Sequence, residues 1–244
     1  MVRLFYATEI RHVACALALL LVSACAAPTV IVSEVQPDGS LAILGPAPHF
    51  AEIFESGQWI AVGDTAPGTL VVTEKFGQRA LFIPPGTQTF TILRTIDANL
   101  LSTPYLGWSW LIEHRDGDYH DVSILVGFRA PPKAPKQASF DSLPDTVRAT
   151  PANRAVEIRW AASALRRGDL SPSTDDGTIP FYVMRGGREN SGRWWRENID
   201  LLALYASLWP GENPAKTRIA FIAINVGPNR ATSPAYISDM RLFR

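Results

Sequence analysis

The densest run of side chains suited to metal or acid–base chemistry is Glu113–Asp121, which reads Glu-His-Arg-Asp-Gly-Asp-Tyr-His-Asp. Its carboxylates would favour Ca²⁺, and its two histidines would favour a transition metal. The spacing matches neither a calcium-binding loop nor a helical pair of histidines. A solvated Asp-Gly turn between two strands explains the same residues, so we predict no metal and no other cofactor here.

Recognisable catalytic patterns do not occur in the sequence. It lacks a Gly-x-Ser-x-Gly elbow, and none of its histidines lies in a general-base motif. A glycosidase could use two carboxylates such as Asp121 and Glu157, but exposed carboxylates are common on strands. The glycine-rich stretch around Arg185 and Arg188 lacks the Lys-Ser/Thr of a phosphate-binding loop, so we predict a hairpin loop there. The lack of these sequence motifs favours a protein that is not an enzyme.

Aromatic side chains are the stronger candidates for ligand binding, since the chain has seven tryptophans. Trp194 and Trp195 are adjacent in a predicted strand, so one must point outward if the other points inward. An outward indole beside Arg193 or Arg196 would form a platform for a sugar ring, and Tyr105 could line the same face. The alternative is that the outward tryptophan lies beneath the loop of residues 130–151.

Composition excludes several classes of protein. The chain has 244 residues, 23 basic and 23 acidic side chains, 47% hydrophobic residues and two cysteines. These figures exclude a disordered or collagen-like chain and a disulfide scaffold. The absence of a basic excess also argues against nucleic acid as a partner.

The beginning of the sequence has the order of a secretory signal peptide. Arg3 and Arg11 lie in a polar start, the apolar run 13–22 follows, and small residues come next. A membrane-spanning helix needs about 20 apolar residues, so this run is too short for one.

The segment Leu21-Val22-Ser23-Ala24-Cys25 resembles the lipobox of bacterial lipoproteins. That resemblance implies cleavage before Cys25, acylation of its thiol and N-terminus with palmitate-type chains, and a lipid anchor in the membrane. Ala26 then favours the outer membrane, with the body facing the periplasm. The alternative is cleavage near Ala26-Ala27 and a soluble periplasmic protein. We therefore divide the chain into a signal peptide (1–24), a lipidated tether (25–48) and one folded domain (49–244).

The domain reads as a series of short strands with turn residues about every 8–12 positions, which is typical of a β-sandwich. We expect core side chains from alternate positions of 105–112, pairing of that strand with 122–128 as a hairpin or as neighbours, and a central strand at 219–226. The proline-rich stretch 130–151 should be an exposed connection. The other expected strands are 29–35 in the tether, 58–62, 69–74, 79–83, 89–95, 155–160, 179–184 and 193–197.

One short helix is expected after Asn198 or Asp200, either of which can cap it. Leucine and tyrosine recur at helical spacing from Leu201 to Leu208, and Pro210-Gly211 ends the pattern. This helix should pack against the sandwich.

Several short motifs, taken in order, resemble the bacterial family called domain of unknown function 3047. They are Tyr105-Leu106-x-Trp108-x-Trp110, Gly117-Asp118, Ile124-Leu125-Val126-x-Phe128, Gly192-x-Trp194, Asp200-x-x-x-x-Tyr205 and Ala235-Tyr236-x-x-Asp239-Met240. The resemblance covers most of residues 50–243 and implies a jelly-roll or galactose-binding-like antiparallel β-sandwich. It implies no activity.

Together, the residues and the resemblances predict an envelope lipoprotein that binds a glycan or another envelope component without catalysis. Two alternatives remain: a hydrolase that acts on envelope polysaccharide, and a structural subunit that recognises an envelope protein.

Overall fold

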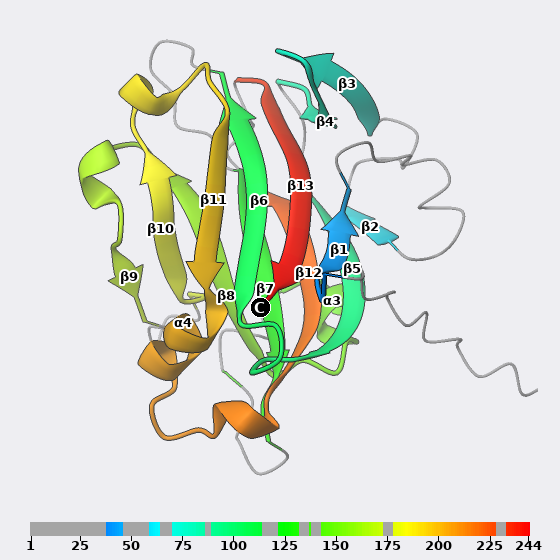
Figure 1. The fold of residues 1–244 in the computed structure, drawn as a ribbon, viewed down its shortest axis with the longest axis vertical. Coiled ribbons are helices and arrows are strands. Elements are labelled where there is room, and N and C mark those ends of the chain that lie inside the picture. Colours follow the sequence, from blue (N-terminus) through cyan, green and yellow to red (C-terminus); the bar gives the residue numbers. More distant parts are fainter. Residues whose placement is uncertain are drawn as a thin grey trace, which may run out of the picture. The chain divides into compact units, whose positions relative to one another are not determined.

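Runs of alternating apolar residues form two β-sheets that stack face to face (Figure 1). The computed structural model describes residues 38–45, 59–63, 70–85, 89–113, 122–131, 137, 143–172, 178–227 and 233–244. All of them belong to the unit Ser33–Arg244. The prediction of a mainly β two-sheet sandwich is confirmed.

The six-stranded sheet has the order β11-β6-β13-β4-β3, and β1 also pairs with β13. Its strands are β1 (Leu41–Leu44), β3 (Val71–Lys75), β4 (Gln78–Ile83), β6 (Tyr105–Ile112), β11 (Trp195–Asp200) and β13 (Ala235–Phe243). All the pairings between its described strands are antiparallel.

The seven-stranded sheet has the order β2-β5-β12-β7-β8-β10-β9. Its strands are β2 (Trp59–Gly63), β5 (Phe90–Asn99), β7 (Val122–Arg129), β8 (Arg154–Ala161), β9 (Leu170–Ser171), β10 (Phe181–Gly186) and β12 (Arg218–Val226). β10 runs parallel to β8. The prediction of an antiparallel sandwich is therefore wrong for this pair of strands. β12 lies between β5 and β7, which confirms its predicted central place.

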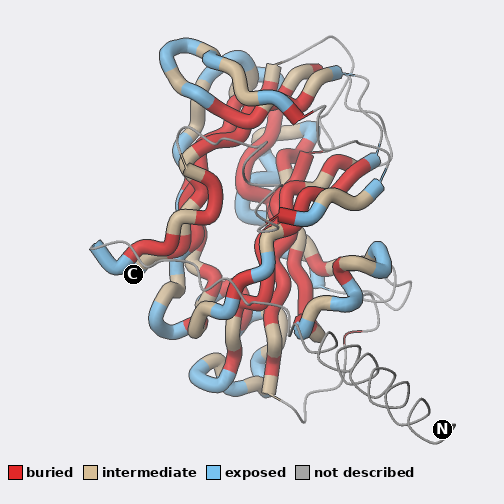
Figure 2. The backbone as a smooth tube through the Cα atoms, turned by 90° about the vertical axis from the view of Figure 1, so that its right-hand side faces the viewer, coloured by how far each residue is buried: buried red, intermediate tan, exposed pale blue. Residues whose placement is uncertain are grey.

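The core lies between the two sheets, where the inward residues of β6, β7 and β12 meet. Leu106, Trp108, Trp110 and Ile112 form the inward row of β6, as their alternation predicts. Figure 2 shows buried residues along the strands and exposed ones mainly at the turns.

Helical segments are short and lie at the margins of the sandwich. They are α3 (Asp145–Arg148), α4 (Leu201–Leu208) and the 3₁₀ turns η3 (Ala164–Arg166), η4 (Arg188–Asn190) and η5 (Pro214–Lys216). The side chain of Asp200 caps α4 by accepting the Ala203 N–H at 2.8 Å, which confirms the predicted start. None of the helices in the described ranges combines the length and apolar character needed to cross a bilayer.

Three predictions about the elements were wrong. β6 and β7 neither form a hairpin nor lie side by side, because they belong to different sheets and face each other across the core. β1 lies in the predicted tether but pairs with β13. The connection 130–151 is not simply exposed, since its buried Val147 packs on the outer face of the seven-stranded sheet. The predicted strand 29–35 lies outside the described residues.

Candidate functional site

The β3–β4 hairpin presents an exposed aromatic ring at its tip. Lys75 pairs with Gln78, so Phe76 and Gly77 are the two turn residues. Both have positive φ, 51° and 75°, as in a type I′ turn. Glycine adopts this conformation easily, but phenylalanine rarely does, and the Phe76 side chain is also 70% exposed. A strained, exposed aromatic residue at a turn is a signal of function rather than of stability.

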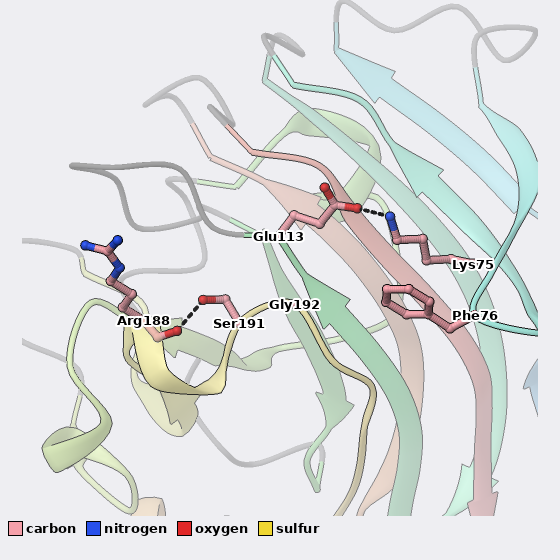
Figure 3. Close-up of a pocket in the computed structure, with 6 residues that line it drawn as sticks. All are labelled: Lys75, Phe76, Glu113, Arg188, Ser191 and Gly192. Carbon is pink, nitrogen blue, oxygen red and sulfur yellow. Dashed lines mark hydrogen bonds and ion pairs between the residues drawn. The ribbon is translucent and has the colours of Figure 1, made fainter.

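The tip of the β3–β4 hairpin is the first wall of the site, and the loop that follows β10 is the second wall. η4 and the next two residues turn back toward β6, and the Gly192 N–H donates to the Ile112 carbonyl at 2.8 Å. The Ser191 hydroxyl donates to the Arg188 carbonyl. These bonds hold Arg188, Ser191 and Gly192 opposite the hairpin tip (Figure 3).

Glu113, directly after β6, lies between the two walls (Figure 3). Its carboxylate forms an ion pair with Lys75 and accepts a hydrogen bond from the Tyr236 hydroxyl at 3.2 Å. The hydrogen bond to Glu113 raises the pKa of the Lys75 ammonium, and burial raises the pKa of the Tyr236 phenol. At neutral pH Lys75 is therefore charged and Tyr236 is neutral.

An open pocket of about 450 Å³ is lined by Lys75, Phe76, Glu113, Arg188, Ser191 and Gly192. That volume lies within the range of about 300–1,000 Å³ typical of small-ligand sites. The pocket combines an aromatic ring with ammonium, guanidinium, carboxylate and hydroxyl groups, so it can contact an apolar face and hydrogen-bond a polar rim at once.

Trp194 supports this pocket from behind. Its indole N–H donates to the Lys75 carbonyl at 2.9 Å, and its ring contacts Tyr236 edge-on. Trp194 and Trp195 pack in different apolar clusters, on opposite faces of the sheet, as the alternation predicted. The outward tryptophan thus positions the hairpin that carries Phe76.

Trp195 does not have the open ring predicted for a sugar platform. The guanidinium groups of Arg185 and Arg193 lie 3.5 Å and 4.5 Å from its ring centroid. Its indole N–H donates to the Asn190 carbonyl at 2.7 Å. Trp195 and Arg193 therefore hold the loop that forms the second wall.

Tyr105 lies at the other end of β6, where its ring stacks on Phe243 at 5.5 Å. The register places Trp195 opposite Trp110 and Asp200 opposite Tyr105. At about 3.4 Å per residue, Tyr105 is roughly 17 Å along the strand from the tryptophan pair. The four predicted ligand-binding residues therefore do not form one site.

The other candidates from the sequence are only partly described. Residues 114–121 and Cys25 lie outside the described residues, so their proposed roles stay predictions. Glu157 contacts Ser123 and Arg159. Arg185, from the glycine-rich stretch, is buried in an ion pair with Glu197.

Sequence reasoning missed Lys75 and Phe76, although a signal was present. Two alternating strands flank the dipeptide Phe76-Gly77, at a spacing that leaves only two residues for the turn. Asn-Gly or Asp-Gly is usual at such a turn, so the phenylalanine is the anomaly that would have drawn attention to the site.

No family model matches the chain, and no curated protein matches it. Solved structures with similar folds include a family 12 glycoside hydrolase (8% identity, TM-score 0.41, covering 71% of this chain and 86% of that one). A family 11 carbohydrate-binding module from Clostridium thermocellum shows 7% identity and a TM-score of 0.36, covering 76% and 87%. A family 30 carbohydrate-binding module shows 11% identity and a TM-score of 0.37, covering 88% of each. At such scores these likenesses carry no information about the ligand or chemistry of this chain.

Proposed function

We propose that the sandwich is a non-catalytic glycan-binding module whose site is the pocket beside Phe76. The observation that carries the proposal is the exposed ring of Phe76, held in a left-handed conformation at the rim of a polar pocket. A sugar presents an apolar C–H face and a rim of hydroxyl groups, and an aromatic platform with nearby donors and acceptors complements both.

The polar groups of the pocket suit hydroxyl recognition. Lys75 and Glu113 already form an ion pair, so each can offer its remaining hydrogen-bonding capacity to neighbouring sugar hydroxyls. Hydrolysis of a glycosidic bond usually needs two carboxyl groups. Among the described lining residues Glu113 is the only carboxylate.

The first prediction uses Phe76→Asn, which removes the ring but suits the turn, because Asn-Gly is a preferred type I′ pair. In glycan-array and calorimetric measurements on the full chain, we expect at least a tenfold loss of affinity, or about 1.4 kcal/mol. The midpoint of unfolding should stay the same or rise, since the strain at Phe76 is relieved.

Leu101→Ala provides the matched control, because Leu101 is also an exposed apolar residue, 45% accessible, but does not line the pocket. It should bind like the wild type. Unchanged glycan binding by Phe76→Asn would refute the proposed site. Release of reducing sugar by the wild type would favour the hydrolase alternative.

We also propose that the module is a lipoprotein anchored through Cys25 in the outer membrane, on the lipobox resemblance and the signal-peptide pattern. The second prediction is that bacteria expressing the full chain incorporate labelled palmitate into it. Cys25→Ala should abolish the label and shift the protein to the soluble fraction, whereas Cys15→Ala should do neither. Wild-type protein without label would contradict the proposal.

A further inference from the structure

A second hollow lies at the other sheet, where β8 meets β10. It has a volume of about 250 Å³ and is lined by Arg159, Arg166, Phe181, Val183 and Ala162, among others. This volume is below that of a typical drug-sized site and suits a ligand of about one sugar ring. Guanidinium groups beside an aromatic ring are suited to contact a negatively charged ligand through donors that remain unused.

Arg159 is held rigidly on the outer face of β8. Its guanidinium lies 4.2 Å from the centroid of Phe181, and its Nε donates to Glu157 Oε2 at 2.8 Å. Nη2 donates to the same carboxylate oxygen. One edge of the guanidinium is thus fixed by Glu157, and one face is fixed by the ring.

A row of hydrogen bonds across four strands holds Glu157 in turn. The Ser123 hydroxyl donates to Glu157 Oε1, and Asn225 Nδ2 approaches the Ser123 oxygen at 3.5 Å. The Thr91 hydroxyl donates to Asn225 Oδ1 at 2.7 Å. Such a connected polar network restricts its members to one arrangement, so Arg159 is preorganised before a ligand arrives.

Arg166 approaches the hollow from η3. Ser163 caps this turn by accepting the Leu165 N–H, and Arg166 Nε donates to Asp169 Oδ2 at 3.0 Å. A guanidinium has five N–H donors. Within the part of the chain that the structure describes, Nη1 of Arg159 and both Nη atoms of Arg166 make no hydrogen bond.

We infer that this hollow binds the carboxylate of an acidic sugar, so that the module recognises a glycan containing uronic acid. A planar carboxylate matches the remaining guanidinium edges, and Phe181 and Val183 offer apolar surface to the sugar ring. The inference deepens the proposed function and rests on it. The arginines are partly exposed, so added salt should screen their contact with the ligand carboxylate and weaken binding of the acidic sugar.

The third prediction compares a galacturonic acid trimer with the neutral galactose trimer by titration calorimetry on the full chain. The wild type should bind the acidic trimer at least tenfold more tightly. Arg166→Gln and Arg159→Gln should each remove most of this preference. Arg167→Gln, an exposed neighbour outside the hollow, should keep the preference.

The variants separate this inference from the proposed function. Two results together would support both the proposed function and this inference. Phe76→Asn should lose binding of the neutral trimer, and the preference for the acidic trimer should depend on Arg159 and Arg166. Equal binding of the two trimers, or a preference that survives both arginine substitutions, would overturn the inference and leave the Phe76 site standing. If neither trimer binds while another neutral glycan binds in a Phe76-dependent way, the inference is also overturned. Arg166 is exposed, so its substitution should not perturb folding, and unfolding midpoints check this.

Discussion

At the scale of single residues, the ion pair between Arg185 and Glu197 is a strongly constrained polar group. Both side chains are buried, with 8% and 2% of their surface accessible. Trp110 donates its indole N–H to Glu197 at 3.2 Å, and Trp195 covers the guanidinium. Arg185 is on β10 and Glu197 is on β11, so the pair ties the edges of the two sheets together.

The fourth prediction is that Glu197→Gln destabilises the protein by about 3–5 kcal/mol, because it leaves the Arg185 charge buried without a counter-charge. Urea unfolding measures the change. Asp169→Asn, at the exposed pair with Arg166, should cost less than about 1 kcal/mol. Equal changes in the free energy of unfolding would show that the buried Arg185–Glu197 pair contributes no more to stability than the exposed Arg166–Asp169 pair.

For the candidate site, the alternation of residues along a strand was a better guide than the chemical identity of the residues. Alternation correctly assigned Trp194 and Trp195 to opposite faces, because side-chain direction in a strand is a local property. It could not show that guanidinium groups cover Trp195 or that Trp194 lies behind a hairpin more than a hundred residues earlier. Those contacts depend on which strands meet, and the local alternation of side chains does not carry that information.

At the scale of elements, it was easier to predict which segments form strands than which strands pair with each other. β6, β12 and α4 were predicted because their apolar periodicity or capping residues are local signals. The pairing of β6 with β11 and β13 joins residues that are far apart in sequence, so the nearer β7 was wrongly expected as its partner.

The parallel pairing of β8 and β10 shows a second limit of local signals. β9 and η3 lie between these two strands in sequence and allow the chain to return in the same direction. At the end of this pairing a Cβ on Gly186 would lie 2.4 Å from the Ala161 carbonyl oxygen, so only glycine permits the close approach. The hollow beside Arg159 arises from this pairing and had no counterpart in the predicted elements.

At the scale of the whole molecule, the two proposed subsites belong to different sheets of one sandwich. The Phe76 pocket is built on β3, β6 and the loop after β10, whereas the Arg159 hollow is built on β8 and β10. β10 and the residues that follow it connect the two. Substitutions at either subsite can therefore be compared in one folded body whose two sheets share a hydrophobic core.

The fifth prediction concerns the stability of that body at alkaline pH. The pKa of Lys75 is raised by its hydrogen bond to Glu113, and the pKa values of Tyr205 and Tyr236 are raised mainly by burial. The folded protein therefore holds these protons more tightly than the unfolded chain, whose ordinary pKa values are 10.5 for lysine and 10.0 for tyrosine. By linkage, their stabilising contribution is complete below about pH 10 and is lost as the pH rises through the folded pKa values.

The free energy of unfolding in urea should consequently fall as the pH is raised from about 10 to about 12. Tyr205→Phe should lower it at neutral pH, because the hydrogen bond to Glu212 is lost, yet should make its decline with pH shallower. Glu113→Gln should likewise flatten the decline by removing the partner that raises the pKa of Lys75. A free energy of unfolding that stays level or rises over this range would contradict the assignment, since it would require the unfolded chain to bind these protons at least as tightly as the folded one.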